Sequence, residues 1–443
     1  MIKGLGVFTS DVKMTNPFDT YKKATYPKVK DFLGYCMAHL RQRYLRILLT
    51  KGLRFSPLVG ILGHRQVGKT TLLQDISQEY MTFDDPSLLL KAQKKPKDFI
   101  QSIASKNKKN PLTIDECQLA PEIFPVLKDH VRINKRPGQF LLSGSVRFSS
   151  KKAIRESLTG RILTLELLPF SIRELRHQSV STSLFDILDS KNLENLLERK
   201  SQELKESLKL RSDIEKYLQC GGLPGLCFLR EESLRRKNIE EQMVLMLDRD
   251  LRTIYGTTLP YRQILDFTRL LAENEGVKLK HSVIRRKIGI SEETQKHLLY
   301  TLEALFLIRA MKIEGDSAGN VYYLEDQAEH RFLAPDSSSI KNYEGLFYRN
   351  LRIQLFYQID RTYTFFKFQT RGGASVPIAI DIDGKKIGFI VMEEDEPTKS
   401  HTMSAHSFLR KYGNAKIVFV STTAKKAQAK DDRTLLAPIE WFC

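Results

Sequence analysis

The first half of the chain alternates short apolar runs with amphipathic segments. Apolar, β-prone runs occur at 57–62 (PLVGIL), 111–114 (PLTI) and 138–148 (GQFLLSGSVRF). Strand patterns also occur at 80–87 (YMTFDDPS) and at the start of 157–175, while TTLLQDIS, after the first run, spaces its apolar residues as a helix does. Buried strands that alternate with helices predict an α/β fold built on a parallel sheet.

The second half predicts more helix and then a second α/β region. Leucines separated by charges over 184–210 predict packed helices, and CGGLPG at 220–225 predicts a tight turn. Three helical patterns and a hairpin pattern follow, at 263–274, 280–289, 290–308 and 309–324. Strand patterns around one helix after residue 340 predict a small α/β domain.

Length and composition are typical of a globular protein with several domains. At 443 residues the chain is too long for one ordinary hydrophobic core. No apolar run approaches the roughly 20 residues of a membrane span, and the N-terminus lacks a secretory signal pattern. We therefore expect a cytoplasmic protein without a membrane partner. The five cysteines form no CxxC pair and the nine histidines no HExxH pattern, which disfavours a disulfide framework and a zinc site.

Net charge is the strongest signal in the bulk composition. The chain has 71 lysines and arginines against 52 aspartates and glutamates, a formal net charge of +19. Such an excess indicates contact with DNA or another polyanion, but a lysine-rich proteome produces the same value without any function. The excess is densest around 38–55, where a packed helix with a solvated basic face explains it adequately.

Residues 63–70 (GHRQVGKT) have the spacing of a phosphate-binding loop, between a predicted strand and a predicted helix. Glycines let successive N–H groups face the phosphates, and the helix N-terminus adds its positive end. Lys69 would reach the outer phosphates, and Thr70 would place its hydroxyl on Mg²⁺. The candidate nucleotide-binding residues of this stretch are Gly63, His64, Arg65, Gln66, Val67, Gly68, Lys69, Thr70 and Thr71.

Polar residues at later strand patterns extend this site toward hydrolysis. Asp115 and Glu116 follow the run PLTI; the aspartate would hold Mg²⁺, and the glutamate would deprotonate the attacking water. Ser143 and Ser145 stand at the next strand tip, where a polar side chain would touch the γ-phosphate. Arg161 opens the following strand and is a candidate for stabilising the charge of phosphoryl transfer. The plainer alternatives are an acidic surface turn and a surface arginine.

Motifs that the sequence lacks narrow the nucleotide class. No NKxD follows the loop, so guanine specificity is not supported, and LLSGS lacks the GGQ of a transporter ATPase. A small-molecule kinase remains open. The paired Asp115 and Glu116 favour hydrolysis by water over transfer to a second substrate.

In this order the segments resemble a family of bacterial and archaeal predicted ATPases of the AAA superfamily that carry a C-terminal domain of unknown function. The matching stretches, spread over most of the chain, are GHRQVGKTTLL, TFDDP, IDECQLAPEIFPVLK, LLSGS, SLTGR, LPFSIREL, YLQCGGLPG, LDRDL and VYYLEDQ. The resemblance implies ATP binding and hydrolysis on a P-loop sheet with an additional strand, with Gln118 as a further candidate sensor. His64 stands where the family usually has proline.

The helical patterns and hairpin over 260–313 look like a helix-turn-helix with a wing. Ser291 is the expected N-cap of the third helix, and DNA would be contacted there. Arg285, Arg286 and Lys287 would grip a phosphate backbone, whereas Glu292 and Glu293 would repel it. The alternative is a module that packs on the ATPase core.

In the family, the C-terminal region looks like a restriction-endonuclease fold, but this sequence departs from its metal-binding motifs. Ser375-Val376-Pro377 and Ile390-Val391-Met392 stand where the acidic motif and the Glu-x-Lys motif would fall. The nearby acids are Asp381, Asp383, Glu393 and Glu394. A hairpin around Asp383-Gly384 explains the first two more simply, so we expect a binding or docking domain without nuclease activity.

These interpretations predict an α/β P-loop ATPase in five regions: a basic helical segment (1–45), the P-loop ATPase domain (46–178), a helical lid or linker (179–257), a winged helix (258–330) and a degenerate nuclease-like α/β domain (340–443). ATP and Mg²⁺ are the expected cofactors, and ATP hydrolysis would rearrange the domains. An ATP-regulated nucleic-acid-binding protein is the alternative. A protein partner and a homo-oligomer remain open.

Overall fold

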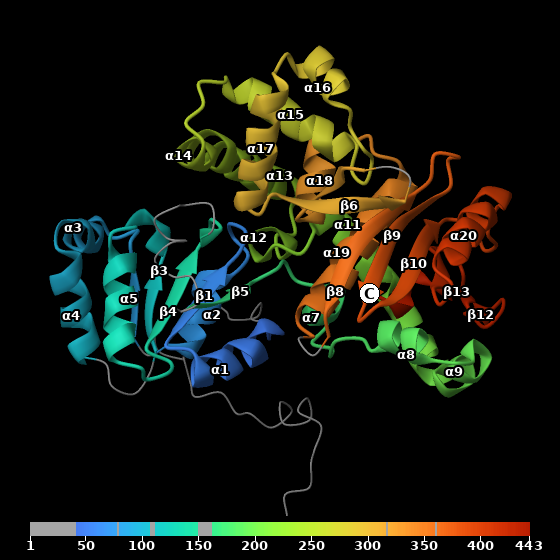
Figure 1. Ribbon diagram of the computed structural model, residues 1–443, viewed down its shortest axis with the longest axis horizontal. Helices are drawn as coiled ribbons and strands as arrows, with labels where there is room; N and C mark the ends of the chain where they lie inside the picture. The colour runs from blue at the N-terminus through green and yellow to red at the C-terminus, as the bar shows by residue number, and fades with distance from the viewer. Residues whose placement is uncertain (1–40, 78, 107–110, 149–161, 316–317, 359–360) are drawn as a thin grey trace, which may run out of the picture. The chain divides into compact units, whose positions relative to one another are not determined.

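A computed structural model describes residues 41–77, 79–106, 111–148, 162–315, 318–358 and 361–443 (Figure 1). Gln42–Cys443 forms one compact unit. Most of the predicted N-terminal segment and the candidate Arg161 lie outside the described residues. No helix in the described part of the chain is both long and apolar enough to cross a membrane.

The P-loop region forms a parallel sheet, which confirms the predicted fold class. Among the described residues it has five strands, in the order β2-β3-β4-β1-β5. Their bounds are β1 Leu58–Leu62, β2 Glu79–Thr82, β3 Leu112–Asp115, β4 Phe140–Gly144 and β5 Ile162–Glu166. Strand β4 lies between β1 and β3, so this is the additional strand that the resemblance implied, and it brings the LLSGS tip beside the acidic strand.

Helices cover both faces of this sheet. They are α1 Leu45–Phe55, α2 Lys69–Ile76, α3 Pro86–Lys94, α4 Pro96–Lys106, η2 Cys117–Leu119 and α5 Ile123–Ile133. Val59 and Ile61 pack in one core with residues of α1 and α2. Leu58 and Leu62 pack in another with α4 and α5. Because β1 is buried on both faces, it reads as a continuous apolar run.

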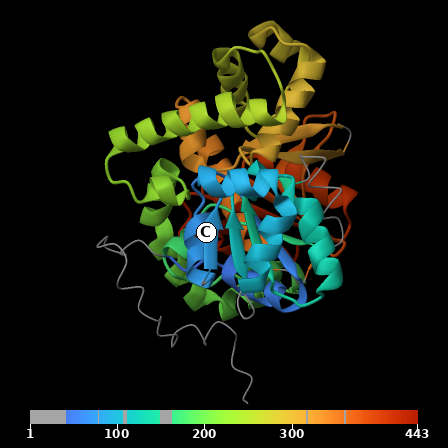
Figure 2. The same ribbon diagram turned by 90° about the vertical axis from the view of Figure 1, so that its left-hand side faces the viewer.

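Helical segments connect this sheet to the rest of the chain. They are α7 Ile172–Leu175, α8 Ser183–Asp189, α9 Leu193–Arg199, α10 Ser201–Ser207, η4 Leu208–Leu210, α11 Arg211–Cys220, α12 Pro224–Cys227, α13 Glu232–Val244, η5 Leu245–Asp250 and α14 Leu251–Ile254. Figure 2 shows α13, η5 and α14 as one continuous rod. Its middle segment, η5, is π-helical, a local geometry that is frequent at functional sites.

The three predicted helices and the hairpin are present. They are α15 Tyr261–Glu273, α16 His281–Ile288, α17 Glu292–Ala304, β6 Ile308–Gly315 and β7 Asn320–Leu324. Ser291 caps α17 by accepting from the Thr294 N–H. Strand β6 also pairs in parallel with β8, so the hairpin continues the C-terminal sheet. The sequence could not reveal this pairing, because it joins strands that are far apart in the chain.

The C-terminal sheet is mixed. Its order among the described residues is β12-β13-β11-β10-β9-β8-β6-β7. The remaining elements are α18 Gln327–Leu333, α19 Ser339–Phe356, β8 Tyr363–Gln369, β9 Ser375–Ile382, β10 Lys385–Met392, α20 Lys399–Lys411, β11 Lys416–Ser421, β12 Gln428–Ala429, β13 Thr434–Pro438 and η6 Ile439–Trp441. Helix α19 packs on one face of the sheet and α20 on the other.

The turn between β9 and β10 is the hairpin expected at Asp383-Gly384. Both residues have positive φ, 51° and 84°, which a two-residue type I′ turn requires. The Asp381 carboxylate accepts from the Gly384 N–H and pairs with Lys386. This aspartate is therefore held within its own hairpin.

Candidate nucleotide site

The phosphate-binding loop connects β1 to α2 and is held by close backbone approaches. Gly68, the residue before α2, has φ 94°, which favours glycine. A Cβ on Gly63 would lie 2.4 Å from the Leu167 carbonyl oxygen, so a larger residue does not fit there. Val67 is fully buried. The two glycines of the motif are thus required by local geometry.

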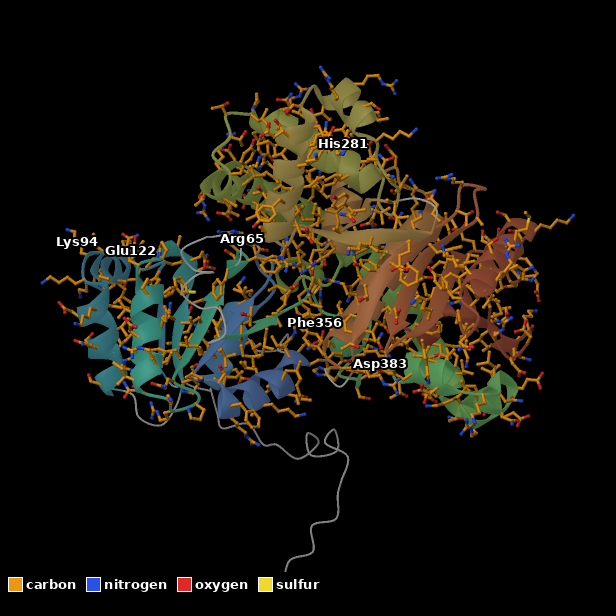
Figure 3. The ribbon with its side chains drawn as sticks, viewed as in Figure 1. Arg65, Lys94, Glu122, His281, Phe356 and Asp383 are labelled. Atoms are coloured by element: carbon orange, nitrogen blue, oxygen red, sulfur yellow. The ribbon has the colours of Figure 1, made fainter. Side chains whose placement is uncertain are left out.

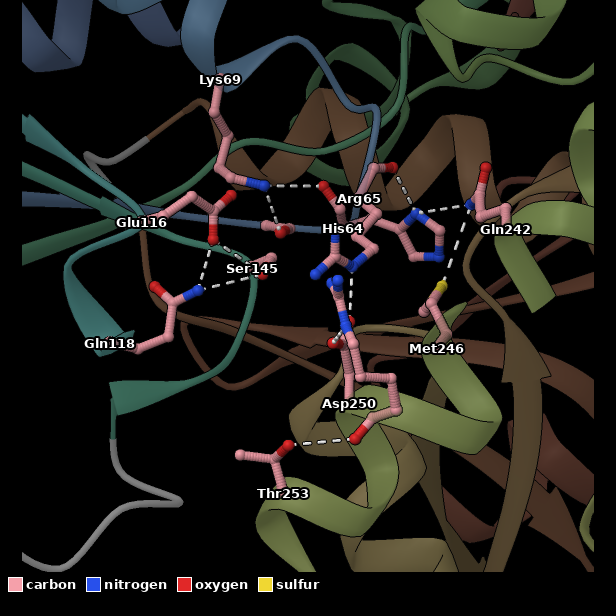
Figure 4. Close-up of polar contacts among 12 residues, drawn as sticks. His64, Arg65, Lys69, Glu116, Gln118, Ser145, Gln242, Met246, Asp250 and Thr253 are labelled. Atoms are coloured by element: carbon pink, nitrogen blue, oxygen red, sulfur yellow. Dashed lines mark hydrogen bonds and ion pairs between the residues drawn. The ribbon is translucent and has the colours of Figure 1, made fainter. Parts of the chain in front are cut away.

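Lys69 is buried within this loop. Its Nζ donates to the carbonyl oxygens of Gly63 and His64, both at 2.9 Å (Figure 4). Burial lowers its pKa to about 8, although the carboxylates of Glu116 and Asp115 act in the opposite direction. The ammonium group therefore lies inside the loop, at the N-terminus of α2.

The Asp115 carboxylate is the hub of the site, in the sense that it accepts hydrogen bonds from several of the surrounding residues. Its Oδ2 accepts from the Thr70 hydroxyl at 2.7 Å and from the Tyr80 hydroxyl at 2.6 Å. Its Oδ1 accepts from the Ser143 hydroxyl and from the Glu116 N–H. Carboxylate and hydroxyl oxygens are the donor set that suits Mg²⁺, so the side chains of Asp115 and Thr70 fit a magnesium ion.

Glu116 lies beside this hub in a constrained conformation. Its φ is 52°, an uncommon value for a residue other than glycine, and one that often marks functional sites. The Gln118 side-chain amide and the Ser145 hydroxyl both donate to its carboxylate, the latter at 3.2 Å (Figure 4). Two polar groups therefore orient the Glu116 carboxylate, which the sequence predicted to be the general base.

A cavity of about 220 Å³ opens beside Glu116. Its wall includes Arg65, Ser145, Arg249 and Asp250. Asp250, in η5, pairs with both arginines: its Oδ2 lies 2.5 Å from Arg65 Nε and its Oδ1 lies 3.0 Å from Arg249 Nε. Two cations therefore face the same cavity as the candidate base, held there by one carboxylate.

The loop also contacts elements far along the chain. The His64 side chain is buried, and its Nε2 lies 3.1 Å from Glu329 Oε1 on α18. Gln242 of α13 donates to the same Glu329 oxygen at 2.9 Å. Burial lowers the pKa of His64, but Glu329 outweighs this effect, so the net direction is upward. The imidazole thus points toward α18, while the His64 carbonyl oxygen contacts Lys69.

Arg43 lies before α1 and contacts the phosphate-binding loop. The sequence analysis did not identify it. Its guanidinium donates to the Val67 carbonyl at 2.9 Å and lies 4.1 Å from the centroid of the Phe170 ring. It also pairs with the buried Glu174 at 3.4 Å. A long-range contact of one arginine leaves no local signal in the sequence.

The structure brings most of the predicted site residues together. Thr70, Asp115, Glu116, Ser143 and Ser145 lie in one contiguous hydrogen-bonded group beside the loop. Lys69 lies close enough to interact electrostatically with Glu116 and Asp115. Thr71 is exposed on α2, and Gln66 is exposed with its side chain close to Gly225. Sequence reasoning also missed Tyr80 and Asp250, although both stand in segments that it had quoted.

Comparison with known proteins agrees with this geometry. Residues 56–176 match a family described as an AAA domain. This region, which has the P-loop α/β fold described above, is therefore similar to AAA domains. Residues 211–314 match a domain of unknown function, so the region beyond the AAA domain gains no assigned role.

Two relatives are similar over most of the chain. They are uncharacterized proteins of Mycobacterium bovis and Mycobacterium tuberculosis, each 23% identical over 389 residues, which is 83% of this chain and 77% of theirs. Among solved structures, a Walker-type ATPase of Pyrococcus abyssi is 17% identical with a TM-score of 0.38, over 65% of this chain and 94% of that one. AMPPCP-bound DnaA from Aquifex aeolicus is 16% identical with a TM-score of 0.23, over 58% and 86%.

Proposed function

We propose that the AAA domain hydrolyses ATP with Mg²⁺, and that Glu116 is the general base. The observation that carries this proposal is the position of Glu116. Its carboxylate follows the Asp115 hub, is oriented by Gln118 and Ser145, and lines the cavity. A water held there would lose its proton to Glu116 as it attacks the γ-phosphate.

The remaining residues bind and orient the nucleotide. The N–H groups of the loop and the ammonium of Lys69 would hold the outer phosphates. Thr70 and Asp115 would hold Mg²⁺, which neutralises the charge that develops on the phosphates. Ser143 and Ser145 would sense the γ-phosphate from the tip of β4. Arg161 remains the proposed charge stabiliser from the sequence.

We further propose that ATP binding is coupled to rearrangement of the C-terminal elements through two residues of the phosphate-binding loop, His64 and Arg65. Arg65 is paired with Asp250 of η5, and a phosphate group would compete with that carboxylate for the guanidinium. His64 is paired with Glu329 of α18. A shift of the loop on ATP binding would therefore act on α18 and on the α13–η5–α14 rod.

Phosphate release from ATP tests the proposed activity. Lys69→Ala removes the ammonium from the loop, so the magnesium-dependent rate should fall roughly 100-fold or more. Lys94→Ala is a matched control, because Figure 3 places Lys94 on α3, away from Arg65 at the loop; its rate should equal the wild-type rate. No turnover by the wild type, or equal turnover in all three proteins, would refute the proposal.

Nucleic-acid binding is a second candidate function, supported by the surface of α16. Arg285, Arg286 and Lys287 lie exposed in its last turn, and none of them forms an ion pair with another described residue. Glu292, which would repel phosphates, is paired with Lys296 at 2.8 Å. Binding to duplex DNA should fall steeply with salt, and Arg285→Ala should lower the salt slope by about one. Absent or salt-independent binding would count against this function.

For the C-terminal domain we propose a binding role without nuclease activity. Ile390, Val391 and Met392 are buried apolar residues at the position of the Glu-x-Lys motif. Asp381 is paired with Lys386 in its hairpin. In the part of the chain that the structure describes, no group of three or more His, Cys, Asp or Glu is arranged to hold a metal ion. Plasmid cleavage with Mg²⁺ or Mn²⁺ that Asp381→Ala abolishes would overturn this view.

A further inference from the structure

A second cavity, of about 350 Å³, lies at one edge of the C-terminal sheet. Strands β10, β11 and β13 run parallel, so their carboxyl ends meet at this edge. Glu393 directly follows β10, Thr422 follows β11, and Glu440 stands two residues after β13; all three line the cavity. In open sheets of this kind, ligands bind in the crevice outside the carboxyl ends of parallel strands.

Two buried polar atoms of residues that line this cavity lack hydrogen-bond partners among the described residues. Glu440 is 1% exposed, and its Oε1 accepts from Arg211 Nε at 2.5 Å. Its other oxygen, Oε2, and the Nη2 of Arg211 have no partner among the residues that the structure describes. Buried polar groups are nearly always hydrogen-bonded, so an unpaired acceptor beside an unpaired donor indicates a ligand that supplies both partners.

The charge of the wall indicates the sign of that ligand. The cavity is lined by three acidic residues, Glu215, Glu393 and Glu440, and by one arginine, Arg211, which pairs with Glu440. This local acidic excess stands in a chain whose net charge is +19. The ring of Tyr343 lines the same cavity, and an aromatic face attracts organic cations. The site therefore favours a ligand with more positive than negative charge.

We propose that this cavity binds a small zwitterionic ligand with an additional positive charge, the chemistry of a basic amino acid. Arg211 Nη2 takes a carboxylate oxygen of the ligand, and Glu440 Oε2 accepts from its ammonium group. The second cationic group is held by Glu215 and Glu393. The site lies outside the AAA domain and does not depend on ATP hydrolysis.

Calorimetric titration of the full chain with L-arginine and L-lysine tests this proposal. Saturable binding of at least one is expected, and L-glutamate should not bind. Agmatine lacks the carboxylate and should bind at least several-fold more weakly than L-arginine, because Arg211 then gains no partner. No saturable binding of either basic amino acid in the millimolar range, or equal affinity for agmatine and L-arginine, would overturn the proposal.

Variants locate the binding. Glu440→Gln should lower the affinity roughly tenfold or more, because a charge-assisted hydrogen bond is lost. If this buried substitution prevents folding, Glu215→Gln provides the same test at an exposed position and should lower the affinity several-fold. Glu394→Gln, next to the cavity residue Glu393, is the matched control and should leave it unchanged. Equal affinity in Glu215→Gln and wild type, or displacement of the amino acid by Mg²⁺, would contradict the assignment.

Discussion

Two single residues in the site make contacts for which a phosphate group would compete. Lys69 keeps its ammonium against two carbonyl oxygens of its own loop, in a buried position that disfavours charge. Asp250 holds two arginines that face the cavity. In both cases a phosphate group is the natural competitor, so each contact yields a test at the residue scale.

The affinity for ATP should fall as the pH rises through and above 8. Burial lowers the pKa of Lys69 to about 8 in the free protein, and the proposed contact with the phosphates of ATP would need the charged ammonium. Binding therefore takes up a proton above this pH, and affinity falls by up to about tenfold per pH unit. Calorimetry at pH 7 and pH 9 measures the effect. Lys69→Arg keeps its charge throughout this range, so its affinity should stay flat. A wild-type affinity that stays equally flat would contradict the role of Lys69.

Asp250→Asn should raise the affinity for ATP several-fold. The substitution removes the negative charge that competes with the phosphates for Arg65. Asp248→Asn is the matched control, because Asp248 lies in the same segment but pairs with Arg252. Fluorescent ATP analogues measure both. Weaker binding by Asp250→Asn would instead make Asp250 a support that positions Arg65 for the nucleotide.

At the scale of elements, Arg43 attaches the segment before α1 to the phosphate-binding loop and to α7. Arg43 contacts the loop, the Phe170 ring and the carboxylate of Glu174, which is buried at the start of α7. Burial raises the pKa of Glu174, and Arg43 opposes that shift. One arginine thus ties α1, the loop and α7 together.

Arg43→Ala should lower the free energy of unfolding by about 3–5 kcal/mol, because it leaves the Glu174 charge buried without its partner. Arg46→Ala breaks a partly exposed ion pair with Asp75 and should cost under about 1 kcal/mol. Urea denaturation of both variants gives the comparison. Equal losses would show that the buried ion pair contributes no more than the surface one.

The elements of the AAA domain were predictable because their signals are local. Strand β1, Lys69 and Thr70 stand in one continuous stretch, and Asp115 and Glu116 directly follow an apolar run. Ser143 followed from the rule that parallel strands end at one edge. The contact of Tyr80 with Asp115 depends on the register between β2 and β3, and the pairing of β6 with β8 joins distant segments. Neither leaves a periodic pattern to read.

At the scale of the whole molecule, the tip of β4 is attached to α17 and β6. Arg147, three residues after β4, donates from its backbone to the Ala304 carbonyl at 2.9 Å and from Nε to the Glu303 carbonyl at 3.1 Å. Its guanidinium lies 4.7 Å from the centroid of the Phe306 ring. Glu166, at the end of β5, pairs with Arg309 of β6. The strand that carries Ser143 is therefore connected to the three-helix region.

A non-hydrolysable ATP analogue with Mg²⁺ should change amide hydrogen exchange in α17 and β6. Movement of the β4 tip would pass through Arg147, so Arg147→Ala should bind the analogue but lose most of that change. Arg132→Ala, on the exposed side of α5, is the control and should behave as the wild type. An unchanged response in Arg147→Ala would exclude this route of coupling.

The central claim is that Glu116 performs the chemistry at a site assembled by Lys69, Thr70 and Asp115. Glu116→Gln keeps the size and hydrogen-bonding capacity of the side chain and removes its basicity. The account predicts that this variant binds ATP with wild-type affinity and releases phosphate roughly 100-fold to 10,000-fold more slowly. A Glu116→Gln variant that releases phosphate at the wild-type rate would contradict it.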